Sequence, residues 1–240
     1  LAGKDIHDAT TSPTPTTDYT KNLRNPIKGK KIGISSKYLE EVDSEVIKTF
    51  EKAKKIFERL GAVVIDIADL GIEILDPKYS ISVYTILQRA EVSSNLARFD
   101  GIRYGNKREQ FGDEAKRRIM LGTYTLSAGY YDAYYKKALK VRTIIVNEFH
   151  NMFEQVDSFI APTSPSTALP VGSSKNHPMF GEMADVLVEP SSIAGLPGIN
   201  VPCGFSNNDL PIGLQIMGPQ FNEESILNFA YQYEIATEWH

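Results

Sequence analysis

Serine side chains are the first candidates for chemistry in this chain, because a serine activated by a neighbouring base can attack a carbonyl group. The sequence contains four adjacent pairs: Ser35-Ser36, Ser93-Ser94, Ser173-Ser174 and Ser191-Ser192. No pair lies in a glycine-rich loop whose backbone N–H groups could stabilise an oxyanion, and no G-x-S-x-G motif is present. We therefore interpret the pairs as helix caps and turns, and expect no catalytic nucleophile within the chain.

Thiol and metal chemistry have no support either. Cys203 is the only cysteine, which excludes a disulfide framework, and it lies in the apolar run NVPCGF, where a thiol is typically buried and inert. The spacings H-x-x-x-H, C-x-x-C and D-x-D-x-D-G, which hold zinc or calcium, are absent from the sequence. The sequence therefore predicts no metal site.

The stretch 111–143 combines cations with aromatic rings. Lys116, Arg117 and Arg118 precede five tyrosines: Tyr124, Tyr130, Tyr131, Tyr134 and Tyr135. Such a mixture can stack nucleic-acid bases, or the tyrosines can belong to a core with their hydroxyls at its edge, and we favour the core. Arg118 also has an ordinary alternative, a surface ion pair with Glu114 one helical turn earlier.

Charge is distributed unevenly along the chain. The net charge of the 240 residues is −4, but residues 100–142 carry +5 and residues 143–240 carry −10. The basic segment either binds a polyanion or packs on the acidic half of its own chain, and we favour packing. With 42% hydrophobic residues the chain is long enough for a large core, and about 11,000 Å² of surface is expected when folded.

Alternating helix and strand patterns predict the fold class. Apolar residues recur every three or four positions from Val42 to Leu60, which predicts an amphipathic helix between two strands of a βαβ unit. Strands are expected at 31–35, 62–67 (buried), 156–162, 193–205 and 210–218. Helices are expected at 79–98, from 113 past Met120 with interruptions at Gly122 and Gly129, at 131–155, around 179–187, and at 222–237. The pattern predicts an α/β domain with a mixed β-sheet flanked by helices, preceded by a loop-rich segment at 1–28.

Asp185 is a further candidate. It lies in GEMADVLVEPSSIAGLPG, where it precedes a loop rich in Ser, Gly and Pro, and such loops place binding groups over a sheet edge. A lone Asp is equally typical of a turn or a helix cap. From the residues alone, the prediction stops at an α/β domain with a candidate polar site.

Several blocks together resemble one known family. They are AEVSSNLARFDGIRYG, FGDEAKRRIMLGTYTLSAGYYDAYYKKALKVRT, IAPTSPSTAL, SSIAGLPGINVPCGF and PIGLQIMGPQFNEESIL. In order and in content they resemble the A subunits of tRNA-dependent amidotransferases, which belong to the amidase signature family. The resemblance covers essentially the whole chain and implies the C-terminal portion of an amidase signature fold, present as a single partial domain over 1–240.

The resemblance implies an activity that this chain does not hold alone. The family's catalytic serine, cis-serine and lysine are expected upstream of Leu1, because nothing here resembles the signature region. The intact subunit is expected to hydrolyse glutamine and supply ammonia for converting Glu-tRNA(Gln) to Gln-tRNA(Gln). The partners implied are the B and C subunits, with ATP and Mg bound in a partner subunit rather than here, in the cytoplasm and not at a membrane.

The resemblance also implies a glutamine pocket. Arg118 matches the residue that binds the carboxylate, with Arg117 as the alternative, Asp185 matches the residue that binds the ammonium, and Tyr84 matches a tyrosine lining the pocket. Two departures from the family pattern are the short Asn106–Gln110 loop and Ser191-Ser192 in place of a Val-Asn pair.

Two other functions remain open for a chain of this kind: a non-catalytic scaffold that binds other subunits, and part of a general small-amide hydrolase of the same family. The basic, tyrosine-rich block at 111–143 favours the tRNA-linked subunit over a general hydrolase. We also expect the chain by itself to lack amidase activity and to expose an unpaired strand edge.

Overall fold

A computed structural model describes residues 2–173 and 183–238 of the chain. Its strands are β1 (Lys31–Ile34), β2 (Val63–Asp66), β3 (Ser158–Pro162), β4 (Gly198–Phe205) and β5 (Pro211–Met217). Its α-helices are α1 (Ser44–Arg59), α2 (Lys78–Leu96), α3 (Asp113–Thr125), α4 (Lys136–Phe153), α6 (Glu189–Ala194) and α7 (Glu223–Ile235). Short 3₁₀ turns are η1 (Ser36–Leu39), η2 (Ile67–Leu70) and η3 (Arg108–Gln110), and η4 (Tyr131–Tyr135) is a π-helical turn.

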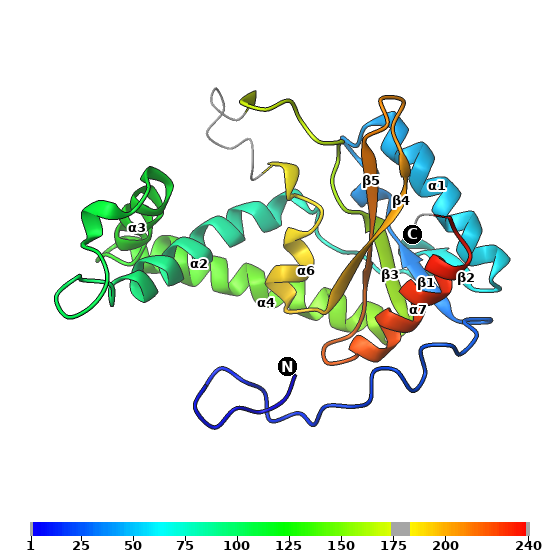
Figure 1. The fold of residues 1–240 in the computed structure, drawn as a ribbon, viewed down its shortest axis with the longest axis horizontal. Coiled ribbons are helices and arrows are strands. Elements are labelled where there is room, and N and C mark those ends of the chain that lie inside the picture. The colour runs from blue at the N-terminus through cyan, green and yellow to red at the C-terminus, as the bar shows by residue number, and fades with distance from the viewer. Residues whose placement is uncertain (1, 174–182, 239–240) are drawn as a thin grey trace.

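The strands form one mixed sheet in the order β2-β1-β3-β5-β4 (Figure 1). β1 pairs in parallel with β2 and β3, whereas β5 runs antiparallel to β3 and β4. The predicted α/β class with a mixed sheet is therefore confirmed, including the βαβ unit made by β1, α1 and β2. No helix among the described residues is long and apolar enough to cross a bilayer.

Two layers of helices cover the sheet and enclose its core. On one face, Phe57 of α1 stacks on Tyr233 of α7 with ring centroids 5.1 Å apart, and both side chains are almost completely buried. On the other face, Phe149 of α4 meets Phe159 of β3 edge to face at 6.3 Å. We call this sheet with its two helical layers the body.

A helical arm made of α2, α3 and η4 extends away from the body (Figure 1). Gly122 is the only buried residue of α3. The helix runs straight through this glycine, so the expected interruption is wrong: a Cβ at Gly122 would lie 2.5 Å from the carbonyl carbon of Arg89 on α2. The missing side chain lets the two helix backbones approach closely at their crossing.

Two other predictions about elements are corrected. Of the run expected to be a buried strand at 62–67, only Val63–Asp66 is a strand, and its residues are exposed or half-buried because β2 has a neighbour on one side only; the flanking Ala62 and Ile67 are buried. The strand expected at 193–205 begins at Gly198, since the preceding residues form α6, which Gly195 closes with a left-handed conformation at φ 70°. The helix expected around 179–187 lies partly outside the described residues, and Met183 and Ala184 are helical.

The arm also contradicts the expectation that its tyrosines are core. Tyr124 and Tyr134 are 53% and 49% exposed, because no layer of the described chain covers the outer side of α3 and η4. The ion pairs of Arg118 and Lys136 are made with Glu114 and Asp132 of the same segment. The expected packing on the acidic half involves the end of the basic segment, where the Arg142 guanidinium donates to the Ile193 carbonyl of α6 at 2.9 Å.

The exposed area is also larger than expected. The chain exposes 14754 Å², against the expected area of about 11,000 Å² for a compact monomer. The arm and the extended N-terminal segment are poorly covered by the rest of the chain. This explains why the exposed area is larger than expected.

Candidate functional site

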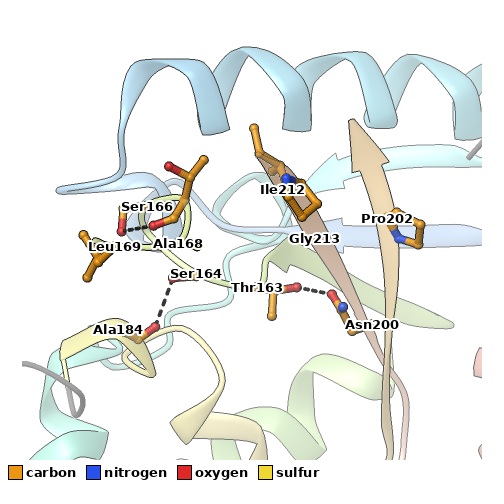
Figure 2. Close-up of a pocket in the computed structure, with 12 residues that line it drawn as sticks. Thr163, Ser164, Ser166, Ala168, Leu169, Ala184, Asn200, Pro202, Ile212 and Gly213 are labelled. Atoms are coloured by element: carbon orange, nitrogen blue, oxygen red, sulfur yellow. Dashed lines mark hydrogen bonds between the residues drawn. The ribbon is translucent and has the colours of Figure 1, made fainter. Parts of the chain in front are cut away.

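A pocket of about 420 Å³ opens at the carboxyl end of β3, beside β4 and β5 (Figure 2). Hydroxyl, amide and small apolar side chains line it: Thr163, Ser164, Ser166, Thr167, Ala168, Leu169, Ala184, Asn200, Pro202, Pro211, Ile212 and Gly213. Carboxyl ends of strands are where open α/β sheets commonly bind ligands, since the loops that follow them can diverge there. This location makes the pocket the candidate functional site.

Local strand pairing positions the polar floor of the pocket. The backbone N–H of Thr163 donates to the Gly213 carbonyl at 3.0 Å, which continues the β3–β5 pairing by one residue. The Thr163 hydroxyl donates to the Asn200 side-chain oxygen (Figure 2). Gly213 makes room for this pair, because a Cβ there would lie 2.5 Å from Asn200 Oδ1 and 2.8 Å from Thr163 Oγ1. This feature was not predicted from the sequence, where its signal was a glycine in the middle of an apolar strand.

The chemistry available in the pocket is binding rather than catalysis. None of the twelve lining residues is ionisable. Without a base beside them, the hydroxyls of Ser164 and Ser166 are not activated as nucleophiles. Hydroxyl and carboxamide groups beside an apolar wall suit an uncharged polar group. Cys203, on the opposite face of β4, is buried, and burial raises the pKa of its thiol to about 12, as expected for an inert cysteine.

Asp185 lies directly beside this pocket, in the turn between Ala184 and α6. The Ser164 hydroxyl donates to the Ala184 carbonyl at 3.2 Å (Figure 2). The buried Gln215 amide donates to the Pro162 carbonyl at 2.9 Å and to the Leu187 carbonyl at 2.8 Å. These bonds tie the turn to the end of β3. Partial burial raises the pKa of the Asp185 carboxyl, and no charged neighbour among the described residues offsets that effect.

Arg118 and Tyr84 come together on the arm, where α3 crosses α2. The Arg118 guanidinium bonds Glu114 at 2.6 Å and also hydrogen-bonds Tyr84. Arg117, the alternative carboxylate ligand, bonds the same Glu114 at 2.7 and 2.8 Å. The two arginines hold the pKa of Glu114 down at about 2, and the bond to Glu114 raises the pKa of Arg118.

The three predicted binding residues thus fall into two places. Tyr84 and Arg118 touch each other on the arm, whereas Asp185 lies at the pocket beside β3, and no described charge reaches its carboxylate. Figure 1 shows α3 at the far end of the arm and the turn before α6, in gold, near the root of the arm. Their convergence on one ligand stays a prediction. No group of three or more potential metal ligands occurs among the described residues.

Comparisons with known proteins identify the family of this chain. The profile of the Amidase family matches residues 1–227. The A subunit of glutamyl-tRNA(Gln) amidotransferase from Clostridium botulinum is 46% identical over 100% of this chain and 52% of its own length. The same-named protein of Caldanaerobacter subterraneus is 47% identical over 98% of this chain and 50% of its own length. The chain therefore spans about half the length of these relatives.

Solved structures agree with the sequence relatives. The crystal structure of the glutamyl-tRNA(Gln) amidotransferase A subunit from Thermotoga maritima matches 94% of this chain and 46% of its own, with a TM-score of 0.74 and 39% identity. The 6-aminohexanoate cyclic dimer hydrolase, at 18% identity and a TM-score of 0.79, shares the fold over 99% of this chain. Because the family profile matches residues 1–227 and solved members share the fold, this chain belongs to the amidase family.

Proposed function

We propose that this chain is part of the glutamine-hydrolysing subunit of a tRNA-dependent amidotransferase, the subunit that supplies ammonia for making Gln-tRNA(Gln) from Glu-tRNA(Gln). The observation that carries the proposal is 46% identity over the whole chain to a protein named as the A subunit of glutamyl-tRNA(Gln) amidotransferase. The partners in this proposal are the B and C subunits, with ATP and Mg bound outside this chain, and the compartment is the cytoplasm.

The chain's share of the reaction is substrate binding. None of the residues lining the pocket is ionisable, which supports assigning the nucleophile and the lysine that the family resemblance implies to the half of the relatives that this chain does not span. By itself the chain is expected to release no ammonia from glutamine above a buffer blank. Release that a single serine substitution abolishes would contradict the proposal.

Glutamine presents a carboxylate and an ammonium, and these require opposite charges. Arg118 is assigned to the carboxylate: it has five N–H donors, of which Glu114 and Tyr84 engage only some, so others remain for a ligand. Asp185 is assigned to the ammonium, since its side chain is exposed to a ligand and its carboxylate has no described partner charge to displace. Tyr84 lines the arginine's side of the site. The proposal requires α3 and the turn at Asp185 to meet around the ligand.

The test is a kinetic comparison of Arg118→Ala and Asp185→Ala in the full-length subunit, using glutamine and a simple amide without the amino-acid head group. Removing one buried charge contact costs about 2–5 kcal/mol of binding, so KM for glutamine is expected to rise strongly while hydrolysis of the simple amide is kept. Arg117→Ala is the matched control, because Arg117 is the neighbouring residue and bonds the same Glu114. Equal losses on both substrates would show that these residues support the fold instead.

A further inference from the structure

Glu114, Arg117 and Arg118 form a cluster of ion pairs on one face of α3. They occupy positions i, i+3 and i+4 of the helix, where side chains are neighbours. Arg117 donates to both carboxylate oxygens of Glu114, from Nε at 2.7 Å and from Nη2 at 2.8 Å. Arg118 donates from its Nε to the Glu114 oxygen Oε1 at 2.6 Å. We call these three residues the α3 charge cluster.

The bond between Glu114 and Arg118 uses one particular edge of the guanidinium. An arginine has five N–H donors, one on Nε and four on the two Nη atoms. Glu114 accepts from the Nε donor, and the Tyr84 hydroxyl on α2 is hydrogen-bonded to Arg118 as well. With one donor given to each partner, three Nη donors remain, on a side chain that is 29% exposed. A carboxylate can bind two parallel N–H donors of this kind at once.

The bond to Glu114 also restricts the motion of the Arg118 guanidinium. A long, partly exposed arginine has many rotamers, and a ligand that binds through a mobile group has to order it at an entropic cost. Glu114 lies in the first turn of α3, whereas Tyr84 belongs to α2, so Arg118 is held from two helices at once. The guanidinium is thus positioned before a ligand arrives.

The charge of the α3 charge cluster fits one carboxylate. Glu114 stays ionised at neutral pH, because the two arginines hold its pKa at about 2. Two arginines and one ionised glutamate leave a single net positive charge. A ligand with one carboxylate therefore neutralises the cluster, whereas two adjacent cations would face the ligand if Glu114 were absent.

We propose that Glu114 is a positioning residue for the carboxylate of glutamine. It binds the Nε edge of Arg118, fixes the guanidinium and leaves the Nη donors for the ligand, without touching the ligand itself. The inference rests on the proposed function, which assigns Arg118 to the glutamine carboxylate, and it adds a residue that sets how well Arg118 performs that task.

The test measures glutamine kinetics in the full-length subunit, with a simple amide that lacks the amino-acid head group as the second substrate. Glu114→Ala should raise KM for glutamine about tenfold with kcat changed less than about twofold, because the partner that orients the ligand-binding group is lost. Glu114→Gln keeps a neutral acceptor for Nε and should raise KM less, since charge-assisted hydrogen bonds are about twice as strong as neutral ones. Kinetics with the simple amide should stay unchanged in both variants.

Asp113→Ala is the matched control for the loss of a negative charge. Asp113 is the preceding acidic residue in the same first turn of α3, and its carboxylate forms no ion pair with a described residue. KM for glutamine in Asp113→Ala is expected to equal the wild-type value. A rise as large as in Glu114→Ala would assign the effect to the charge of the helix turn and overturn the positioning role.

A double variant separates positioning from a structural role. If Glu114 acts through Arg118, adding Glu114→Ala to Arg118→Ala should leave KM for glutamine at the value of Arg118→Ala alone. A further rise in the double variant, or an equal loss of activity on both substrates in Glu114→Ala, would overturn the proposal.

Failure of this inference differs from failure of the proposed function. An unchanged KM for glutamine in Glu114→Ala, together with a raised KM in Arg118→Ala, would reject the positioning role and keep the assignment of Arg118 to the carboxylate. An unchanged KM in Arg118→Ala would reject that assignment, and the role of Glu114 with it.

Discussion

The body and the arm use the same residue types with opposite results. Tyr38 and Tyr233 in the body are 1% exposed, whereas Tyr124 and Tyr134 in the arm are about half exposed. Body tyrosines lie between the sheet and a helical layer, and arm tyrosines have protein on one side only. Burial of an aromatic side chain in this molecule is therefore decided by the number of layers around it, not by its residue type or its helical spacing.

The largest expected effect tests whether the body carries the stability of the chain. Phe57 is fully buried and its ring packs against Phe229 and Tyr233, so Phe57→Ala should destabilise the chain by about 3–5 kcal/mol. Tyr134→Ala in the arm should change the free energy of unfolding by less than about 1 kcal/mol. Urea titration of both variants measures the two values, and similar losses would erase the distinction between body and arm.

The next effect concerns the link between the body and the candidate site. Gln215→Leu removes the donor to two carbonyls, those of Pro162 and Leu187, and should cost about 2–4 kcal/mol, because a buried polar group without a partner costs about 1–3 kcal/mol. Hydrogen exchange is expected to speed up at 183–188. Gln220→Leu, at an exposed position, is the control. Unchanged exchange at 183–188 would show that Gln215 does not hold the Asp185 turn.

A smaller effect probes the joint inside the arm. Gly122→Ala forces α3 away from the Arg89 carbonyl on α2, and overpacking of this kind costs about 1–3 kcal/mol. Gly112→Ala is the matched control, because a Cβ at Gly112 meets nothing within 4 Å. Faster hydrogen exchange is expected in α3 while exchange in β3 and β5 stays the same. A change that spreads into the sheet would mean that the arm and the body unfold together.

The smallest effect is electrostatic and sharpens the same comparison. Glu114 has a pKa of about 2 in the folded chain, below its ordinary 4.5, so its pairs with the arginines stabilise fully above about pH 4.5 and are lost as the pH falls toward 2. The side chain is 53% exposed and screened, which limits the contribution to under about 1 kcal/mol. Glu114→Gln should therefore be slightly less stable at pH 7, with the difference shrinking below pH 4.5 in denaturant titrations. A pH-independent difference would assign the effect to neutral hydrogen bonds.

Locally encoded elements were predictable from the sequence. The helix at Ser44–Arg59 and the buried strand at Ser158–Pro162 were expected close to their observed ends, and the helix expected at 131–155 is observed as the π-helical turn η4 followed by α4, Lys136–Phe153. Their signals are apolar periodicity and short apolar runs, which act within a few residues. The family also followed from the sequence, because its motifs are contiguous blocks, and the profile match over 1–227 confirms it.

What only the tertiary structure decided depends on neighbours distant in the chain. An apolar β-branched run can be a central or an edge strand, and pairing on one side alone made Val63–Asp66 an edge. A glycine can break a helix or let two helices approach, and Arg89 on α2 made Gly122 a crossing point. Thr163, Asn200 and Gly213 meet because the end of β3 lies beside β5, which pairs with β4, a juxtaposition that no local spacing encodes. The sequence by itself determined the fold class, the family and the candidate residues; tertiary packing decided which surfaces stay open, because that depends on how many layers each element finds around it.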